Sequence, residues 1–272
     1  SALRGALAPL RRKAQRIAFV PTMGALHAGH IALMRAAATQ ADHVVASIFV
    51  NPTQFGANED LSRYPRREAE DAAMLLEAGV ALLWAPDVAT MYPPGHATTI
   101  SVGGLDAALC GAARPGHFEG VATVVAKLLN QVRPDVALFG EKDWQQLAII
   151  RRMVSDLDFG IEIVGVPTVR EADGLAMSSR NGFLSAAQRI AAATLPRAMR
   201  EAIVAMAEGM PVARAIASAH ADILDAGFAS IDYLELRDGD DLSLLDAVQP
   251  GARLFVAARI GTTRLIDNMA AA

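Results

Sequence analysis

Short apolar runs, rich in β-branched and aromatic residues, alternate with helical patterns along most of this chain. The runs lie at 17–20, 44–50, 80–84, 135–139 and 161–166. Apolar residues at helical spacing fill the intervals between them, at about 31–41, 67–78, 119–132 and 144–157. Strands that alternate with helices form right-handed βαβ units and a parallel sheet. The chain is therefore predicted to be an α/β protein with a Rossmann-like, doubly wound parallel sheet.

The pattern changes after about residue 168. Two helical patterns, at roughly 186–208 and 212–226, come first, and strand-like runs at 231–236 and 253–260 follow them. Because helices here precede a group of strands, this part is expected to form a smaller α+β domain. The predicted domains are 1–168 and 169–272.

Composition narrows the possible partners. The chain has 272 residues, a net charge of −4 and no long basic run, which argues against a nucleic-acid partner. Charged residues interrupt each apolar stretch before it is long enough for a membrane span. The single cysteine, Cys110, leaves no internal disulfide and fits a reducing cytoplasm.

The segment after the first run carries the most informative polar residues. His27 and His30 stand at the predicted start of a helix, just after Gly24. Backbone N–H groups and the positive end of the helix favour anions there, and two imidazoles three residues apart share one face. A solvated histidine cap is the plain alternative, and a metal site is disfavoured because no cysteine or carboxylate accompanies the pair. The pattern favours binding of a phosphate group, as in a nucleotide.

Further polar clusters follow other predicted strands. They are Asn51–Gly56, Gly140–Asp143 with Gln145 and Gln146 behind it, and Pro167–Glu171. Because ligands bind at the carboxyl ends of parallel strands, these clusters are expected to meet at one active-site edge. Lys142 is one of only three lysines, beside Lys13 and Lys127, although a chance surface position would also explain it.

Three weaker sets of candidate residues each allow two interpretations. Ser178, Ser179 and Arg180 suit a phosphate clamp, or a loop that leads into a helix. Arg114 and His117 precede a helix and either reach the site or shape the turn that starts it. Glu70 or Asp71 would suit a magnesium ion beside phosphates, although acidic residues in a helix usually face solvent.

Together these segments resemble the pantoate–β-alanine ligase (pantothenate synthetase) family, within the nucleotidyltransferase superfamily. The resemblance rests on PTMGALHAGH, FVNPTQFG, RPGHFEGVATVV, FGEKDWQQL, VGVPTVREADGLAMSSRNGFLS and RLIDN, which occur in family order over essentially the whole chain. Cys110, where the family often has an acidic residue, and Phe183, where tyrosine is common, depart from the pattern without touching the expected chemistry.

The resemblance implies a two-step reaction. ATP and pantoate form a pantoyl adenylate and pyrophosphate, and the amine of β-alanine then displaces AMP to give pantothenate. ATP, Mg²⁺, pantoate and β-alanine are thus the implied cofactor and partners, and a cytoplasmic homodimer is the implied form. The competing readings are another nucleotidyltransferase that leaves AMP on its product, and a non-catalytic nucleotide-binding regulator.

The resemblance also implies that domain 1–168 binds nucleotide and pantoate and that domain 169–272 acts as a lid. It assigns roles to individual residues as well. Catalysis is expected of His27, His30, Lys142 and Arg180, with His30 as general acid. Pantoate is expected at Gln54, Gln146 and Arg114, and magnesium at Glu70. The residues expected to bind ATP are Met23, Gly24, His27, His30, Gly140, Glu141, Lys142, Asp143, Val169, Met177, Ser178, Ser179 and Arg180.

Overall fold

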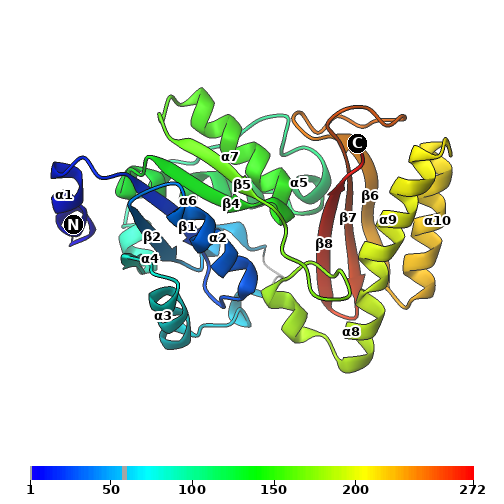
Figure 1. Cartoon of the computed structure of the whole chain (residues 1–272), viewed down its shortest axis with the longest axis horizontal. Helices are drawn as coiled ribbons and strands as arrows, with labels where there is room; N and C mark the ends of the chain where they lie inside the picture. The colour runs from blue at the N-terminus through cyan, green and yellow to red at the C-terminus, as the bar shows by residue number, and fades with distance from the viewer. Residues whose placement is uncertain (1, 57–59) are drawn as a thin grey trace. The chain divides into compact units, whose positions relative to one another are not determined.

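The computed structural model describes residues 2–56 and 60–272. Five parallel strands form one sheet with the order β3-β2-β1-β4-β5, and Figure 1 labels β2, β1, β4 and β5 of this sheet. The strands are β1 (Ile17–Thr22), β2 (His43–Ile48), β3 (Leu82–Trp84), β4 (Val136–Gly140) and β5 (Glu162–Val166). This order confirms the predicted doubly wound sheet, because the direction of winding changes between the neighbours β1 and β4.

Helices cover both faces of the parallel sheet. Ala18 and Val20 of β1 point to the face where α2 (Ala28–Ala38) and α3 (Glu68–Glu77) pack, while Phe19 points to the opposite face. The helix α6 (His117–Val132) is buried along most of its length and packs beside β1. The other helices of the first 156 residues are α1 (Ala2–Arg12), α4 (Val88–Met91), α5 (Leu109–Ala113) and α7 (Trp144–Asp156).

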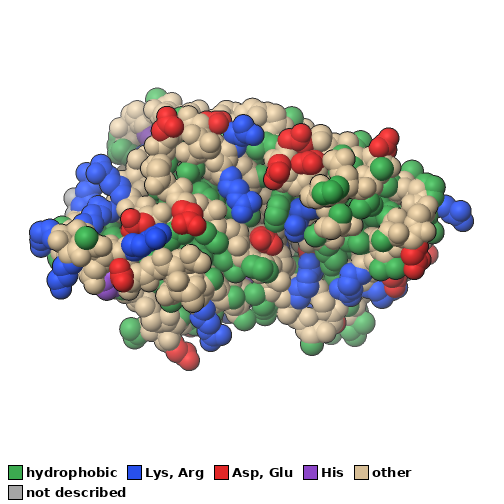
Figure 2. Space-filling view, turned by 45° about the horizontal axis from the view of Figure 1, so that its top comes forward, with side chains coloured by type: hydrophobic (Ala, Val, Ile, Leu, Met, Phe, Trp, Pro, Cys, Tyr) green, Lys and Arg blue, Asp and Glu red, His purple; other side chains and the backbone are tan. Residues whose placement is uncertain are grey.

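The N-terminal helix α1 was not predicted from the sequence, because Gly5 and Pro9 interrupt its pattern. Arg11 in its last turn donates hydrogen bonds to the carbonyl oxygens of Val132 and Arg133, at the C-terminus of α6. A cation is favoured at that end of a helix. Figure 2 shows basic side chains gathered at the left edge of the view, where α1 lies in Figure 1.

The residues fall into two compact units. The first contains 1–104, 114–141 and 149–167, and the second contains 105–113, 142–148 and 168–272. The chain thus passes into the second unit directly after β4, at Lys142, and again after β5, at Thr168. A domain boundary near residue 168 stays a prediction.

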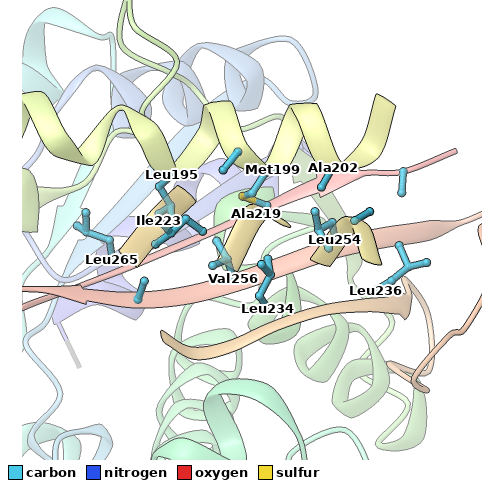
Figure 3. Close-up of a cluster of buried hydrophobic side chains, with 14 of the residues drawn as sticks. Leu195, Met199, Ala202, Ala219, Ile223, Leu234, Leu236, Leu254, Val256 and Leu265 are labelled. Atoms are coloured by element: carbon cyan, nitrogen blue, oxygen red, sulfur yellow. The ribbon is translucent and has the colours of Figure 1, made fainter. Parts of the chain in front are cut away.

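The second unit is built on an antiparallel sheet of order β6-β7-β8. Its elements are α8 (Ala186–Ala192), α9 (Thr194–Ala207), α10 (Val212–Asp225), β6 (Ser230–Asp238), β7 (Ala252–Ile260) and β8 (Thr263–Ala270). Figure 3 shows its core, in which Leu195 and Met199 of α9 and Ile223 of α10 lie over Val256 and Leu265 of the sheet. This confirms the predicted smaller α+β part.

Two details of the predicted elements were wrong. The single helix expected over 186–208 is divided at Ala193, because Pro196 has no N–H to bond back to Ala192 and can stand only in the first turn of a new helix. The strand β8 was missed, since its sequence TRLIDNMA mixes polar and apolar residues without a long β-branched run.

Within the described residues, no helix is long and apolar enough to cross a membrane.

Candidate active site

The segment between β1 and α2 holds the two predicted histidines at a helix N-terminus. His27 is the N-cap of α2, and its Nδ1 accepts a hydrogen bond from the backbone N–H of Gly29 at 3.2 Å. Nδ1 of His30 accepts from the N–H of His27 at 3.3 Å, and the ring centroids lie 4.1 Å apart. Because a backbone N–H can only donate, each neutral ring carries its proton on Nε2. Both rings therefore present an Nε2–H donor.

A buried carboxylate fixes the loop that leads to these histidines. Gly24 and Ala25 both have positive φ angles, 80° and 52°, a conformation that costs energy for alanine. Asp71 of α3, which is only 2% exposed, offsets this cost. Its Oδ2 and Oδ1 accept hydrogen bonds from the N–H groups of Ala25 and Leu26, both at 2.8 Å. A Cβ on residue 24 would lie 3.0 Å from Oδ2 of Asp71. Asp71 thus shapes the loop.

The segment after β2 is held by Asn51, which is 1% exposed. Its Nδ2 donates to Oε1 of Gln54 and to the carbonyl of Gly120, both at 3.1 Å. Its Oδ1 accepts from the hydroxyl of Tyr92 at 2.8 Å, and burial raises the pKa of that phenol, which keeps it a donor. Oε1 of Gln54 is therefore occupied, and its Nε2 faces Sδ of Met23 at 3.0 Å.

Glycine at position 120 allows α6 to approach this segment closely. A Cβ there would lie 2.5 Å from the carbonyl oxygen of Thr53 and 2.8 Å from the backbone nitrogen of Gln54. Both contacts are with backbone, which cannot swing aside as a side chain can. The position of Gln54 thus depends on Gly120, which lies 66 residues later in the chain.

Arg114 and His117 hold the backbone of Gln54. Nδ1 of His117 lies 2.8 Å from the carbonyl oxygen of Gln54, and Nη2 of Arg114 donates to the same oxygen at 3.3 Å. Nη1 of Arg114 lies 2.9 Å from Nε2 of His117. Since a guanidinium only donates, Nε2 of His117 accepts and Nδ1 donates. These bonds join the segment after β2 to the start of α6, and binding of pantoate at Arg114 stays a prediction.

The turn after β4 enters the second unit at Lys142. Its side chain is 19% exposed, and Nζ lies 3.8 Å from Oδ1 of Asp143. Gln145 is buried and bonds to the carbonyls of Leu105 and Ala108, each at 2.8 Å. Of the two glutamines at the start of α7, Gln145 is therefore structural, and Gln146 is the half-buried one that stays a predicted pantoate ligand.

The segment from Val169 to Arg180 folds back on itself in the second unit. Met177 N–H donates to the carbonyl of Val169 at 3.0 Å, and Arg170 pairs with Ala176 in an antiparallel bridge. Ser178 caps a short 3-10 helix, with its Oγ accepting from the N–H of Arg180 at 3.2 Å. The residues predicted to bind nucleotide from this segment, Val169, Met177, Ser178, Ser179 and Arg180, are all half-buried.

The predicted magnesium residue lies on the outside of α3. The Glu70 side chain is 71% exposed, and its Oε2 lies 3.8 Å from Nη1 of Arg67. Among residues 2–56 and 60–272, no group of three or more His, Cys, Asp or Glu side chains is arranged to hold a metal ion. Glu70 stays a predicted magnesium ligand.

Sequence reasoning missed three residues that hold these segments in place. Asn51 and Asn268 stood inside quoted motifs but had no role, and Asp71 was considered only for magnesium. The available signal was that each is a polar residue of a kind that needs a hydrogen-bond partner when it is buried. Their partners, however, lie on other elements, so their function required the structure.

A parallel sheet with polar loops at its carboxyl edge, and a histidine-capped helix after its first strand, define an α/β protein of the Rossmann-like nucleotide-binding class. The model of the pantoate–β-alanine ligase family matches residues 1–270. The chain belongs to this family. It is a ligase that joins pantoate to β-alanine through an amide bond.

Individual relatives agree along the full length. Pantothenate synthetase of Sphingopyxis alaskensis is 63% identical over 267 residues, covering 98% of this chain and 96% of the relative. The crystal structure of pantothenate synthetase from Thermus thermophilus is 49% identical, with a TM-score of 0.94 over 99% of this chain and 97% of that one. A pantoate–β-alanine ligase from Francisella tularensis, complexed with β,γ-ATP and β-alanine, is 33% identical, with a TM-score of 0.83 over 99% and 95% of the two chains.

Proposed function

We propose that the loops described above carry out an ATP-dependent ligation in two steps. Pantoate attacks the α-phosphorus of ATP through its carboxylate, which gives pantoyl adenylate and releases pyrophosphate. The amine of β-alanine then attacks the acyl carbon, which gives pantothenate and releases AMP. The observation that carries this proposal is the histidine pair: both Nδ1 atoms accept backbone N–H groups at the start of α2, so both rings offer Nε2–H donors beside the helix N-terminus.

Those donors suit the phosphates of ATP. The attack on phosphorus gathers negative charge on the oxygens, and fixed donors stabilise this transition state more than the ground state. His30 then acts as the general acid in adenylate formation, with His27, Met23 and Gly24 completing the nucleotide contacts in this loop.

Gln54 is proposed to hold pantoate. Because Asn51 occupies its Oε1, the amide is fixed with Nε2 as the group that donates to substrate oxygens. A neutral donor suits a carboxylate that must remain nucleophilic. Gln146 is proposed to bind pantoate in the same manner. Arg114 is also proposed to bind pantoate, with its guanidinium held in place by its bonds to His117 and Gln54.

The remaining nucleotide contacts are proposed for the second unit and the turn before it. Lys142 is proposed to bind the phosphates and Asp143 the ribose, with Gly140 and Glu141 lining the same turn. Val169, Met177, Ser178, Ser179 and Arg180 are proposed to complete the set, and Arg180 suits phosphate because it donates from several nitrogens at once.

Magnesium is proposed to arrive with ATP. Mg²⁺ in nucleotide enzymes commonly takes one or two carboxylates, with phosphate oxygens and waters as its other ligands. A single exposed carboxylate such as Glu70 fits that requirement, although it offers no complete protein cage. When bound, the ion neutralises charge on the phosphates.

The deciding experiment is exchange of labelled pyrophosphate into ATP, with pantoate and Mg²⁺ present and β-alanine absent. Exchange that requires pantoate is the expected result, because only adenylate formation reverses in this way. A protein that binds ATP and shows no exchange would contradict the proposal and favour a regulator, whereas AMP retained on the product would favour another nucleotidyltransferase.

The same assay tests the role of Lys142. Lys142→Ala is expected to lower the exchange rate by at least about 100-fold, as loss of one transition-state donor commonly does. Lys13→Ala is the matched control, because Lys13 is exposed beyond the end of α1. Equal exchange in the two variants would remove Lys142 from the mechanism.

We also propose that the protein works as a cytoplasmic homodimer. Sedimentation equilibrium of the intact chain tests this, with twice the chain mass of 28.6 kDa as the expected result.

A further inference from the structure

The motif RLIDN near the C-terminus contains two buried polar residues, Asp267 and Asn268, each 3% exposed. They lie side by side on β8, where they pair with Val256 and Phe255 of β7. Neighbouring side chains of a strand point to opposite faces of the sheet. The two residues therefore reach different parts of the second unit, and each must find polar partners there to offset its burial.

Asn268 reaches the turn that contains Lys142. Its Nδ2 donates to the backbone carbonyl of Lys142 at 2.9 Å. Its Oδ1 accepts from Nε and Nη2 of Arg253, at 2.9 and 2.7 Å. Because a guanidinium only donates, the amide oxygen must face Arg253 and the amide nitrogen must face the carbonyl.

Arg253 is itself held in place. Its guanidinium lies over the ring of Trp144, 3.6 Å from the ring centroid, and the indole N–H of Trp144 donates to the carbonyl of Gly239 at 2.7 Å. A guanidinium stacked on an aromatic ring is well restrained. Asn268 thus links the Lys142 turn to a rigid part of the sheet.

Asp267 reaches the segment before Met177. Its two carboxylate oxygens accept hydrogen bonds from Nη1 and Nη2 of Arg170, at 2.6 and 3.0 Å, in a bidentate ion pair. Nη1 of Arg170 also donates to the carbonyl of Gly174 at 3.0 Å, which closes the turn between residues 170 and 176. Asp267 also accepts the backbone N–H of Asn268 at 2.7 Å, which ties its carboxylate to the backbone of β8.

We propose that Asp267 and Asn268 are positioning residues for nucleotide binding: one pair on β8 sets the Lys142 turn and the 169–180 segment together. The inference rests on the proposed function, in which both segments bind ATP. It gives the RLIDN motif a role although neither residue is proposed to touch the substrate. Misplacing a binding group by about 1 Å is enough to cost up to about 100-fold in rate.

Asn268→Asp is the sharpest test. The carboxylate keeps its shape and its acceptors for Arg253, but it has no donor for the Lys142 carbonyl. The Kd for ATP, measured by calorimetry, and the KM for ATP are each expected to rise about tenfold. The KM for pantoate is expected to change less than twofold. A merely structural role would lower the melting temperature without separating the two substrates.

Asp267→Asn provides a second variant if Asn268→Asp folds poorly. It removes the charge that pairs with Arg170 and is expected to weaken ATP affinity in the same way. The matched control is Asp232→Asn. Asp232 lies on β6 of the same sheet and pairs with Arg264 at 2.7 Å, but it has no hydrogen bond or ion pair with either segment among those described. It is expected to leave ATP affinity unchanged.

The outcomes separate this inference from the proposed function. Wild-type ATP affinity in folded Asn268→Asp and Asp267→Asn, or a loss no larger than in Asp232→Asn, would overturn the positioning role. Absence of pantoate-dependent exchange in the unaltered protein would overturn the proposed function instead, and the calorimetric comparison would still decide whether the pair positions a nucleotide site.

Discussion

The two units hold their polar loops by different means. In the first, close packing and bonds to backbone or uncharged groups dominate: Asn51 bonds to Gln54, Gly120 lets α6 approach, and the carboxylate of Asp71 accepts two backbone N–H groups. In the second, arginine pairs do most of the fixing. Packing and bonds to backbone hold one set of loops, and ion pairs between side chains hold the other. The two sets should therefore respond differently to overpacking, salt and acid.

The largest effect is expected from Gly120→Ala. The added Cβ would meet the backbone of Thr53 at 2.5 Å, so the helix or the segment must move. Overpacking of this kind costs about 3 kcal/mol of unfolding free energy, and the displaced Gln54 should weaken pantoate binding. Urea unfolding and the KM for pantoate measure the two effects.

Gly5→Ala is the control for that substitution. Gly5 is also helical, and a Cβ there has no atom within 4 Å. Alanine at an open helical site stabilises by about 0.5–1 kcal/mol, so the two replacements should have opposite signs. Equal effects would show that the close approach at Gly120 does not limit the first unit.

A somewhat smaller effect is expected from Asp71→Ala. It leaves the N–H groups of Ala25 and Leu26 without their acceptor, at about 2 kcal/mol in total for partly buried donors, and it releases the positive φ at Ala25. The rate of pyrophosphate exchange should also fall, and by more than the loss of folded protein explains, because this loop positions His27. Glu70→Ala is the control for stability, because Glu70 is the neighbouring residue and is exposed. It should change the free energy of unfolding by no more than about 0.5 kcal/mol.

The smallest effect concerns charge in the second unit. Arg189 bonds to Asp173 and Glu171, and the Arg189 hydrogen bond lowers the pKa of the Asp173 carboxyl below its ordinary value of 3.8. A lowered pKa means that the folded state favours the ionised form. The stabilisation is therefore complete above pH 3.8 and is lost as the pH falls further, through the folded pKa.

Asp173→Asn tests this sign. At pH 7 the variant should be less stable by under about 1 kcal/mol, since the pair is partly exposed to solvent. The difference should shrink with added salt, and it should begin to shrink as the pH falls below 3.8, in unfolding curves collected from pH 7 to 3. A difference that grows on acidification would contradict the assigned pKa direction.

How much the sequence predicts depends on whether the interactions involved are local or distant along the chain. The five parallel strands and the helix over 117–132 follow from apolar periodicity, which is a local property. Local turn chemistry also placed His27 and His30 at the start of α2. Asp71 and Asn268, by contrast, act on residues 45 to 126 positions away. No local pattern encodes such partners, and a mixed strand such as β8 lacks even the period that would reveal it.

The carboxylate of Asp71 gives the loop after β1 an unusual kinetic character. Loop amides normally exchange their hydrogens with water quickly, because brief local openings expose them. The amides of Ala25 and Leu26 can open only if each breaks its own bond to a buried carboxylate of α3. Exchange at these two positions is thus tied to the opening of α3. A stretch that belongs to neither a helix nor a strand should keep its deuterium label for as long as the sheet beside it.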